Sequence, residues 1–384
     1  MSKGWAILFF FILLFLLPAN NALAEGGFQQ PEIDTGELEG FLKNLDRELD
    51  EKFPELSISN LFEDLKKGKF KFDFAAILQT LLNYSFKELL ANSHFMGQIL
   101  VLVILSAILK NLNSAFEQAT ISKLANSVIF LAVVSVVLYS FNHVIKIGTT
   151  AIEQVMDFIY ALLPVLLTLI AAIGGFTTAT VVHPFVLAGI SILGSLIIKI
   201  VFPLIYFASV MMVVASVSEQ FQVSSFANLL KEISIGVLGL FLTIFIGILS
   251  IQGTASAMAD GVALRTAKFL TGSFIPIVGK VFSEALETVI GTTLLLKSAV
   301  SLIGVIVVVI ICLLPAIKII AIFLIYRLTA AIVQPFGEVG IAKMLESLSG
   351  IMIVIFGTVV AVGLMFFIVI TIIAGLGNMT VFLR

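Results

Sequence analysis

The chain has 384 residues, of which 60% are apolar and 12% are charged, whereas soluble domains average about 45–50% and about 25%. This composition excludes a soluble globular protein and places the chain in a membrane. With 22 Lys and Arg against 24 Asp and Glu, the net charge is −2, so no basic surface for nucleic acid is expected. One cysteine, Cys312, and three scattered histidines offer neither a disulfide nor metal-ligand spacing. We therefore expect no metal or other cofactor.

Residues 1–24 have the pattern of a secretory signal peptide. Lys3 precedes an apolar stretch that runs from Trp5 to Leu17, and Ala22-Leu23-Ala24 then forms an Ala-x-Ala site before Glu25. This arrangement predicts cleavage after Ala24, with an uncleaved signal anchor as the alternative. Both readings place residue 25 outside the cytoplasm.

Residues 25–95 form an acidic region with 14 acidic and 8 basic residues, a net charge of −6. Leucines from Leu38 to Leu49 recur at helical spacing, which predicts a small extracytoplasmic helical region. From Phe74 to Leu89 an apolar stripe widens while Lys87 and Glu88 keep one side polar. This pattern is typical of a helix that lies on the membrane surface.

Residues 96–384 are predicted to form an all-α, polytopic membrane bundle with about nine spans. The segment 182–217 has 36 residues, and at ~1.5 Å per residue it would measure ~54 Å against a hydrocarbon core of ~30 Å. We therefore expect breaks at Pro203, beside Lys199, and at Pro315, beside Lys318. The apolar runs lie at 96–112, 128–144, 158–173, 184–200, 202–217, 233–251, 292–314, 316–333 and 350–373.

Nine crossings that begin outside would place Arg384 in the cytoplasm. Lysines and arginines fall almost equally on both sides of this topology, so the positive-inside rule does not decide the orientation. The orientation therefore depends on the signal sequence alone.

An internal repeat follows two of the predicted spans. Glu117-Gln118, Ser122 and Ala125-Asn126 recur 102 residues later as Glu219-Gln220, Ser224 and Ala227-Asn228. The matches indicate a duplicated unit of span, short amphipathic helix and span, with coincidence in a biased composition as the alternative. Four predicted spans separate the copies, so both should lie on the same side as a parallel repeat. A looser third copy occupies Gln334–Ser349.

The most polar stretch of the membrane portion runs from Asp260 through Arg265, Lys268 and Pro276 to Lys280. A broken element of this kind at membrane depth must be covered by protein or line a water-filled cavity. The alternative is an exposed loop with two short surface helices.

Two further cations lie within apolar runs, Lys297 in the seventh and Arg327 in the eighth. Charges at such depth usually face a bundle interior, pair with an opposite charge or snorkel to the interface. Glu284 and Glu287 are candidate partners of Lys297, and snorkelling is the alternative for Arg327. The candidate polar intramembrane or interface residues are Asp260, Arg265, Lys268, Pro276, Glu284, Lys297 and Arg327.

Motifs of enzymes are missing from the sequence. It contains no G-x-x-x-x-G-K-[ST] phosphate loop, no H-E-x-x-H, no G-x-S-x-G and no paired cysteines. We predict that the protein is not an enzyme, so an energy-driven process would need an external motor.

The segment 250–297 carries a family resemblance. Its motifs resemble the stage III sporulation protein AE family of endospore-forming bacteria: Ser250-Ile251-Gln252-Gly253, Leu264-Arg265-Thr266-Ala267-Lys268-Phe269, Thr271-Gly272, Phe274-Ile275-Pro276, Glu284-Ala285, Thr288-Val289-Ile290 and Leu295-Leu296-Lys297. The resemblance extends over essentially the whole chain, including the signal peptide and the acidic region.

This resemblance implies a mother-cell protein of the outer forespore membrane, within the channel complex that joins mother cell and forespore and supports late forespore development. The implied partners are other stage III sporulation A-operon proteins, including an ATPase and ring-forming proteins, and through them stage II sporulation protein Q. It implies no catalytic residues.

Two functions therefore compete at the level of the sequence. The first is a membrane core component of that secretion-like channel complex, favoured by the resemblance and by the missing ATP site. The second is a self-contained secondary transporter, favoured by the repeat, the interrupted spans and the intramembrane Lys297.

Overall fold

The computed structural model describes residues 36–50, 74–116, 119–217, 223–274 and 278–382, and every element in these ranges is a helix. This confirms the prediction of an all-α bundle. The predicted signal peptide lies outside the described residues. Of the acidic region, the structure describes the helices over 36–50 and from residue 74 onward. The elements are α2 (Gly36–Asp50), α4 (Phe74–Phe116), α5 (Ala119–Ala172), α6 (Phe176–Leu196), the π-helix η1 (Ile197–Val201), α7 (Phe202–Val217), α8 (Ser224–Phe274), α9 (Val278–Val333), the 3₁₀ helix η2 (Gln334–Phe336) and α10 (Val339–Phe382).

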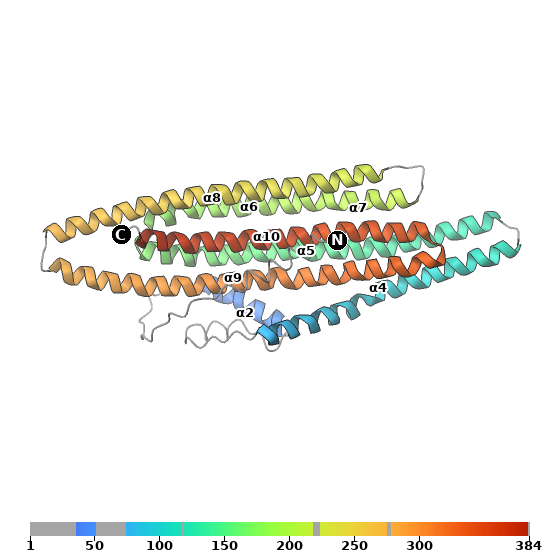
Figure 1. Ribbon diagram of the computed structural model, residues 1–384, viewed down its shortest axis with the longest axis horizontal. Coiled ribbons are helices and arrows are strands. Elements are labelled where there is room, and N and C mark those ends of the chain that lie inside the picture. The colour runs from blue at the N-terminus through green and yellow to red at the C-terminus, as the bar shows by residue number, and fades with distance from the viewer. Residues whose placement is uncertain (1–35, 51–73, 117–118, 218–222, 275–277, 383–384) are drawn as a thin grey trace.

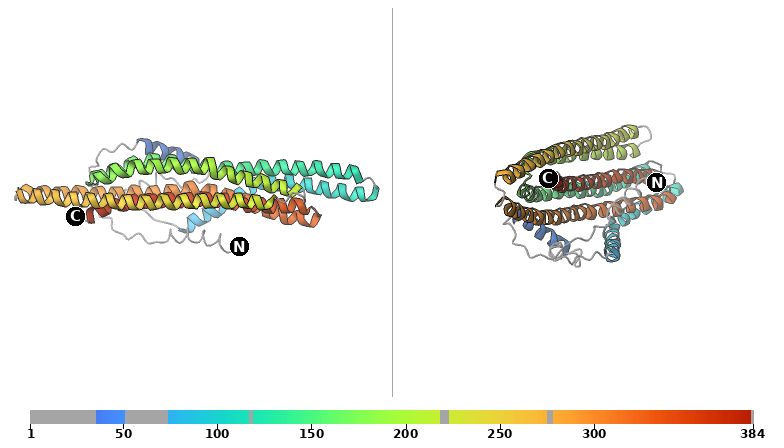
Figure 2. Two further views of the ribbon diagram at one scale, coloured as in Figure 1. Left: turned by 90° about the horizontal axis from the view of Figure 1, so that it is seen from above. Right: turned by 60° about the vertical axis from the view of Figure 1, so that its left-hand side comes forward.

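Long antiparallel helices lie side by side in an elongated bundle (Figures 1 and 2). The central helix is α10, which contacts α5, α7, α8 and α9. Its inward side is apolar and buried, as at Val359, Val362 and Phe366. The short helix α2 packs on α5, where the rings of Phe41 and Phe158 have centroids 5.2 Å apart.

Six of the helices in the described ranges are long and apolar enough to cross a membrane. This corrects the expectation of nine separate spanning segments, because three pairs of apolar runs lie on continuous helices. α5 carries the second and third runs, α6 with η1 and α7 carries the fourth and fifth, and α9 carries the seventh and eighth.

The expected breaks at Pro203 and Pro315 are also wrong, since the helices continue through both prolines. Before Pro203 the backbone widens into η1, and the N–H of Phe202 donates to the Ile197 carbonyl five residues back. A π-helical turn of this kind absorbs an irregular residue without ending the helix. Pro315 lies within α9, which is supported by α4, α5 and α10, and neighbouring helices make an internal proline tolerable.

Charged residues at mid-length explain why the sequence shows more apolar runs than helices. Lys146 of α5 lies between two apolar runs of one helix, and Lys199 of η1 and Lys318 of α9 lie close to the boundary between two runs of one helix. Gly148 packs against Phe202, and Glu88 of α4 lies 3.7 Å from Lys318. Glu88, Lys146, Lys199 and Lys318 therefore lie at similar heights, which we call the central polar level.

The helix ends next to the sequence repeat lie at one end of the bundle. The C-terminal ends of α4, α7 and α9 are at the right in Figure 1, whereas those of α5 and α8 are at the left. This is the arrangement of a parallel repeat, and the looser copy at Gln334–Ser349 shares it. Gln118 and Gln220 themselves lie outside the described residues.

The direction of the last helix changes the expected topology. α4 runs toward the end that holds the repeat connections, and α10 runs away from it (Figure 1). Six crossing helices would therefore return the C-terminal end of α10 to the side from which α4 enters. The expectation that Arg384 lies opposite the N-terminal region depends on an odd number of crossings and does not follow from these helices.

Candidate functional site

Lys297 is the most deeply buried charged side chain in the described part of the chain, with 1% of its surface exposed. Its Nζ donates a hydrogen bond to the Ala374 carbonyl at 2.6 Å and another to Asn378 Oδ1 at 2.9 Å. Both acceptors lie in the last turns of α10, where the negative end of the helix dipole favours a cation. The described contacts of this ammonium are therefore uncharged oxygen atoms.

A glycine makes room for this contact. A Cβ added to Gly377 would lie 2.5 Å from Lys297 Nζ and 3.0 Å from Ile173 Cδ1. Gly375, two residues earlier on the same helix, has no atom within 4 Å of an added Cβ. Gly377 and Gly375 therefore form a matched pair for substitution, because the space beside Gly377 is filled and the space beside Gly375 is empty.

We predict that Gly377→Ala destabilises the protein by about 1–3 kcal/mol, because the new methyl displaces an ammonium that is hydrogen-bonded to both acceptors. Gly375→Ala should leave stability unchanged or raise it by up to about 1 kcal/mol, since alanine is the better helix former. Thermal unfolding of both variants in detergent measures the difference. Equal stability of the two would contradict the described packing around Lys297.

Asp260 acts as a cap for a neighbouring helix. It lies on α8 with 2% of its surface exposed, and its Oδ1 and Oδ2 accept the backbone N–H groups of Thr177 and Thr178 at 2.8 and 2.7 Å. The N-cap residue of α6 is Gly175, which has no side chain to provide this cap. Asp260 satisfies two of the unpaired donors of the first turn and places a negative charge at the positive end of the helix.

A second residue of α8 packs against the α5–α6 connection. Gly174 has φ +94°, a left-handed conformation that favours glycine. A Cβ on Gly174 would lie 2.7 Å from Leu264 Cδ2. Leu264 lies one helical turn after Asp260, so consecutive turns of α8 hold the α5–α6 connection by packing and by hydrogen bonds.

The other predicted residues of this end do not join Lys297 in one described cluster. Arg265 is exposed on α8, whereas Lys297 is buried between α9 and α10. Lys268, Glu284 and Glu287 lie within helices, but the structure does not describe their side chains. Pro276 falls in the undescribed 275–277. The backbone of Glu284 and Glu287 lies ~20 and ~15 Å along α9 from Lys297, and the described hydrogen bonds of Lys297 come from α10 instead.

Arg327 lies near the opposite end of α9 and is half exposed. Its Nη1 is 3.2 Å from Glu346 Oε1 of α10, and its guanidinium carbon lies 5.9 Å from the centroid of the Phe323 ring. Exposed ion pairs of this kind contribute about 0–1 kcal/mol. Arg327 is thus a surface residue that links α9 to α10.

Several polar contacts between distant segments were not predicted from the sequence. Tyr326 Oη donates to the Val137 carbonyl at 2.9 Å and is hydrogen-bonded to Ser140. Ser106 donates to Glu338 Oε1 at 2.6 Å. These partners are separated by 186 to 232 positions, so no local spacing could have indicated them.

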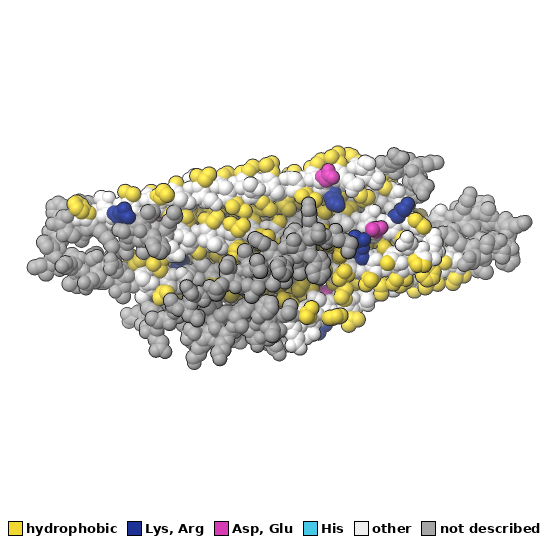
Figure 3. Space-filling model, in the orientation of Figure 1, with side chains coloured by type: hydrophobic (Ala, Val, Ile, Leu, Met, Phe, Trp, Pro, Cys, Tyr) yellow, Lys and Arg dark blue, Asp and Glu magenta, His cyan; other side chains and the backbone are white. Residues whose placement is uncertain are grey.

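The face of the bundle drawn in Figure 3 is largely uncharged. Apolar and uncharged side chains cover most of its described part, with charged side chains gathered right of centre and fewer at the left. Among the described residues, no group of three His, Cys, Asp or Glu side chains could hold a metal ion. The polar chemistry of the candidate site is therefore hydrogen bonding and charge, carried by Lys297 and Asp260.

Comparison with known proteins identifies relatives over most of this length. A family model described as Stage III sporulation protein AE matches residues 56–377. The Stage III sporulation protein AE of Bacillus subtilis (strain 168) is 39% identical over 352 residues, which cover 92% of this chain and 88% of that protein. No solved structure matches the chain.

Proposed function

The chain belongs to the stage III sporulation protein AE family, and we propose that it is a membrane core component of the channel complex that connects mother cell and forespore. The observation that carries this proposal is the extent of the family match. Residues 56–377 include α4 and every long helix that follows it, up to the last turns of α10. The multi-pass membrane bundle as a whole, rather than one motif, therefore shares the family's role in sporulation.

The proposed location is the outer forespore membrane, which derives from the mother cell. The proposed partners are the other stage III sporulation A-operon proteins, including an ATPase and ring-forming proteins, and through them stage II sporulation protein Q. The sequence contains no phosphate-binding loop, which supports dependence on a separate ATPase. The family name states no catalytic role.

A self-contained secondary transporter is the competing function. The parallel placement of the repeat connections and the buried Lys297 would suit a transport site between helices. Reconstitution separates the two functions. We expect that proteoliposomes with this chain alone show no solute uptake above empty vesicles, and that sporulation fails in cells that lack the chain until it is restored. Uptake by the chain alone would contradict the proposal.

We also propose that residues 1–24 are removed and that residues 25–95 lie outside the cytoplasm. The Ala-x-Ala site before an acidic segment is the physical basis. We predict that N-terminal sequencing of membrane-extracted protein begins at Glu25. A retained Met1 would contradict cleavage. Labelling of Glu48→Cys only from the cytoplasmic side, in a Cys312→Ser background, would contradict the topology.

A further inference from the structure

A cavity of about 280 Å³ lies between α5 and α9 at the central polar level. Leu45 of α2 closes one side of it. The polar lining comes from His143, Lys146, Thr150 and Gln154 of α5 and from Lys318 of α9. None of these residues belongs to the site around Lys297.

The register of the two helices brings the two lysines to one end of the cavity. Ser140 of α5 is hydrogen-bonded to Tyr326 of α9, and farther along Leu162 of α5 covers Gly304 of α9. Because the helices are antiparallel, Lys146 and Lys318 lie on the same side of the Ser140–Tyr326 pair, ~9 and ~12 Å from it along the axis. The two lysines therefore lie on opposite walls of the cavity at nearly the same height.

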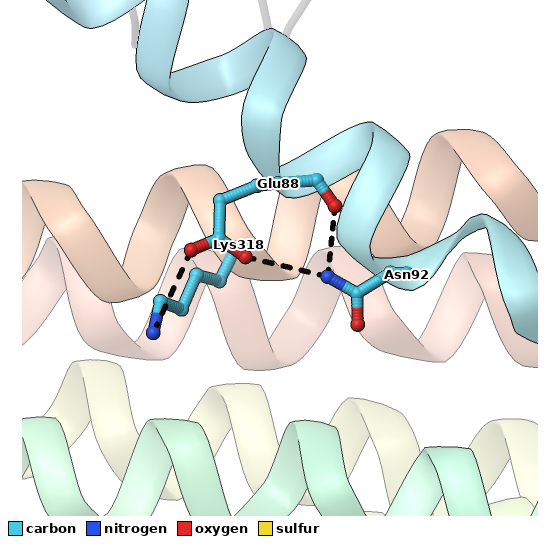
Figure 4. Close-up of polar contacts among 3 residues, drawn as sticks. All are labelled: Glu88, Asn92 and Lys318. Carbon is cyan, nitrogen blue, oxygen red and sulfur yellow. Dashed lines mark hydrogen bonds and ion pairs between the residues drawn. The ribbon is translucent and has the colours of Figure 1, made fainter. Parts of the chain in front are cut away.

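One carboxylate approaches this pair of cations. Glu88 Oε1 lies 3.7 Å from Lys318 Nζ, and the Asn92 amide holds the same carboxylate by donating to Oε2 at 3.3 Å (Figure 4). Asn92 also donates to the Glu88 carbonyl at 2.9 Å. At 3.7 Å the Lys318 contact is an ion pair rather than a hydrogen bond. Lys146 has no carboxylate partner among the described residues, so the cavity keeps a positive balance.

At the opposite end of the cavity, the wall that α9 forms is apolar. Ile310, Ile311 and Leu314 line it together with Pro315. Proline has no N–H, so the Ile311 carbonyl lacks its helical donor and can accept a hydroxyl group from a ligand. Beyond the cavity and the exposed Asp157, residues 158–172 of α5 and 298–309 of α9 contain no Asp, Glu, Lys or Arg. The apolar end therefore opens toward ~18–22 Å of uncharged helix, which is more than half the thickness of a hydrocarbon core.

We propose that this cavity binds the phosphate group of an anionic ligand, with Lys146 and Lys318 as the cationic contacts. The amphipathic form of the cavity favours an anionic phospholipid, whose headgroup meets the lysines while its acyl chains follow the apolar end. Basic pockets between membrane helices bind lipid headgroups in this way. Thr150 supplies an uncharged donor between the two ends, and Gln154 supplies another at the height of Ile311. The proposal concerns a site separate from the sporulation role and does not depend on it.

The test uses the full chain purified in a neutral detergent. Binding is measured with phosphatidylglycerol, with zwitterionic phosphatidylcholine and with inorganic phosphate as separate probes. We expect phosphatidylglycerol to bind at least about tenfold more tightly than phosphatidylcholine. Lys146→Gln should weaken the binding of phosphatidylglycerol at least about tenfold, which corresponds to the loss of one charge-assisted hydrogen bond. Competition by millimolar phosphate would assign the site to free phosphate, and its failure to compete would assign it to lipid.

Lys199→Gln is the matched control, because Lys199 is exposed at the same level but does not line the cavity. It should bind phosphatidylglycerol as the unchanged chain does. If Lys146→Gln elutes as aggregate, Thr150→Val and Lys318→Gln provide the same comparison. Equal binding of the two lipids, or equal affinity of the cavity variants and Lys199→Gln, would overturn the proposal.

Discussion

Asn378→Leu should destabilise the bundle more than Lys297→Met, although both remove the same hydrogen bond. The Asn378 variant leaves a buried ammonium with the Ala374 carbonyl as its remaining described acceptor, and an uncompensated buried charge costs about 3–5 kcal/mol. The Lys297 variant removes the charge itself, and the Asn378 amide that it leaves is exposed, so the cost is that of an ordinary hydrogen bond, about 0.5–1.5 kcal/mol. The double variant should recover much of the loss, because neither a charge nor an amide then remains.

Thermal unfolding in detergent of the two single variants and the double variant completes this double-mutant cycle. The unchanged chain should be the most stable. Lys297→Met and the double variant should follow with similar stability, and Asn378→Leu should be the least stable. Additive effects of the two substitutions would contradict the described contact. In cells, Lys297→Leu should accumulate in the membrane while sporulation is lost, and normal sporulation at normal abundance would contradict a functional role for this cation.

Asp260→Ala should cost about 2–4 kcal/mol, because it leaves the N–H groups of Thr177 and Thr178 without their acceptor at the start of α6. Asp260→Asn keeps one carbonyl oxygen and should lose about half as much. Hydrogen exchange of the first turn of α6 should increase in both variants, and thermal unfolding gives the free-energy difference.

Arg265→Gln is the control for this substitution. Arg265 lies five positions farther along α8 and is exposed, so its replacement should change stability by no more than about 0.5 kcal/mol. An Asp260→Ala variant as stable as Arg265→Gln would show that α6 does not need this cap.

Composition and apolar periodicity were sufficient to predict an all-α membrane bundle, because these properties are local. The number of helices was not predictable in the same way. Lys146, Lys199 and Lys318 interrupt the apolar runs as the ends of spans would, yet each lies within a continuous helix whose neighbours support it. The expected breaks at Pro203 and Pro315 fail for the same reason, since the sequence does not show the π-helical turn or the flanking helices.

The candidate site shows the same division between local and distant information. The depth of Lys297 in an apolar run indicates a side chain that needs polar partners. Its described acceptors lie 77 and 81 positions away on α10, and the nearby Glu284 and Glu287 were the choice that sequence proximity favoured. Asp260 was singled out for its polarity, but its role as a cap for α6 depends on a contact across 83 positions. Such pairings arise from helix packing and have no signature in local spacing.

Affinity purification of the tagged full chain from sporulating cells in mild detergent tests the proposed function most directly. We expect mass spectrometry to find other stage III sporulation A-operon proteins, including the ATPase, in amounts comparable with the chain, and to lose them when the same purification is made from vegetative cells that express it. Recovery of the chain alone from sporulating cells, together with solute uptake by proteoliposomes that contain nothing else, would contradict a component of a channel complex and support a transporter.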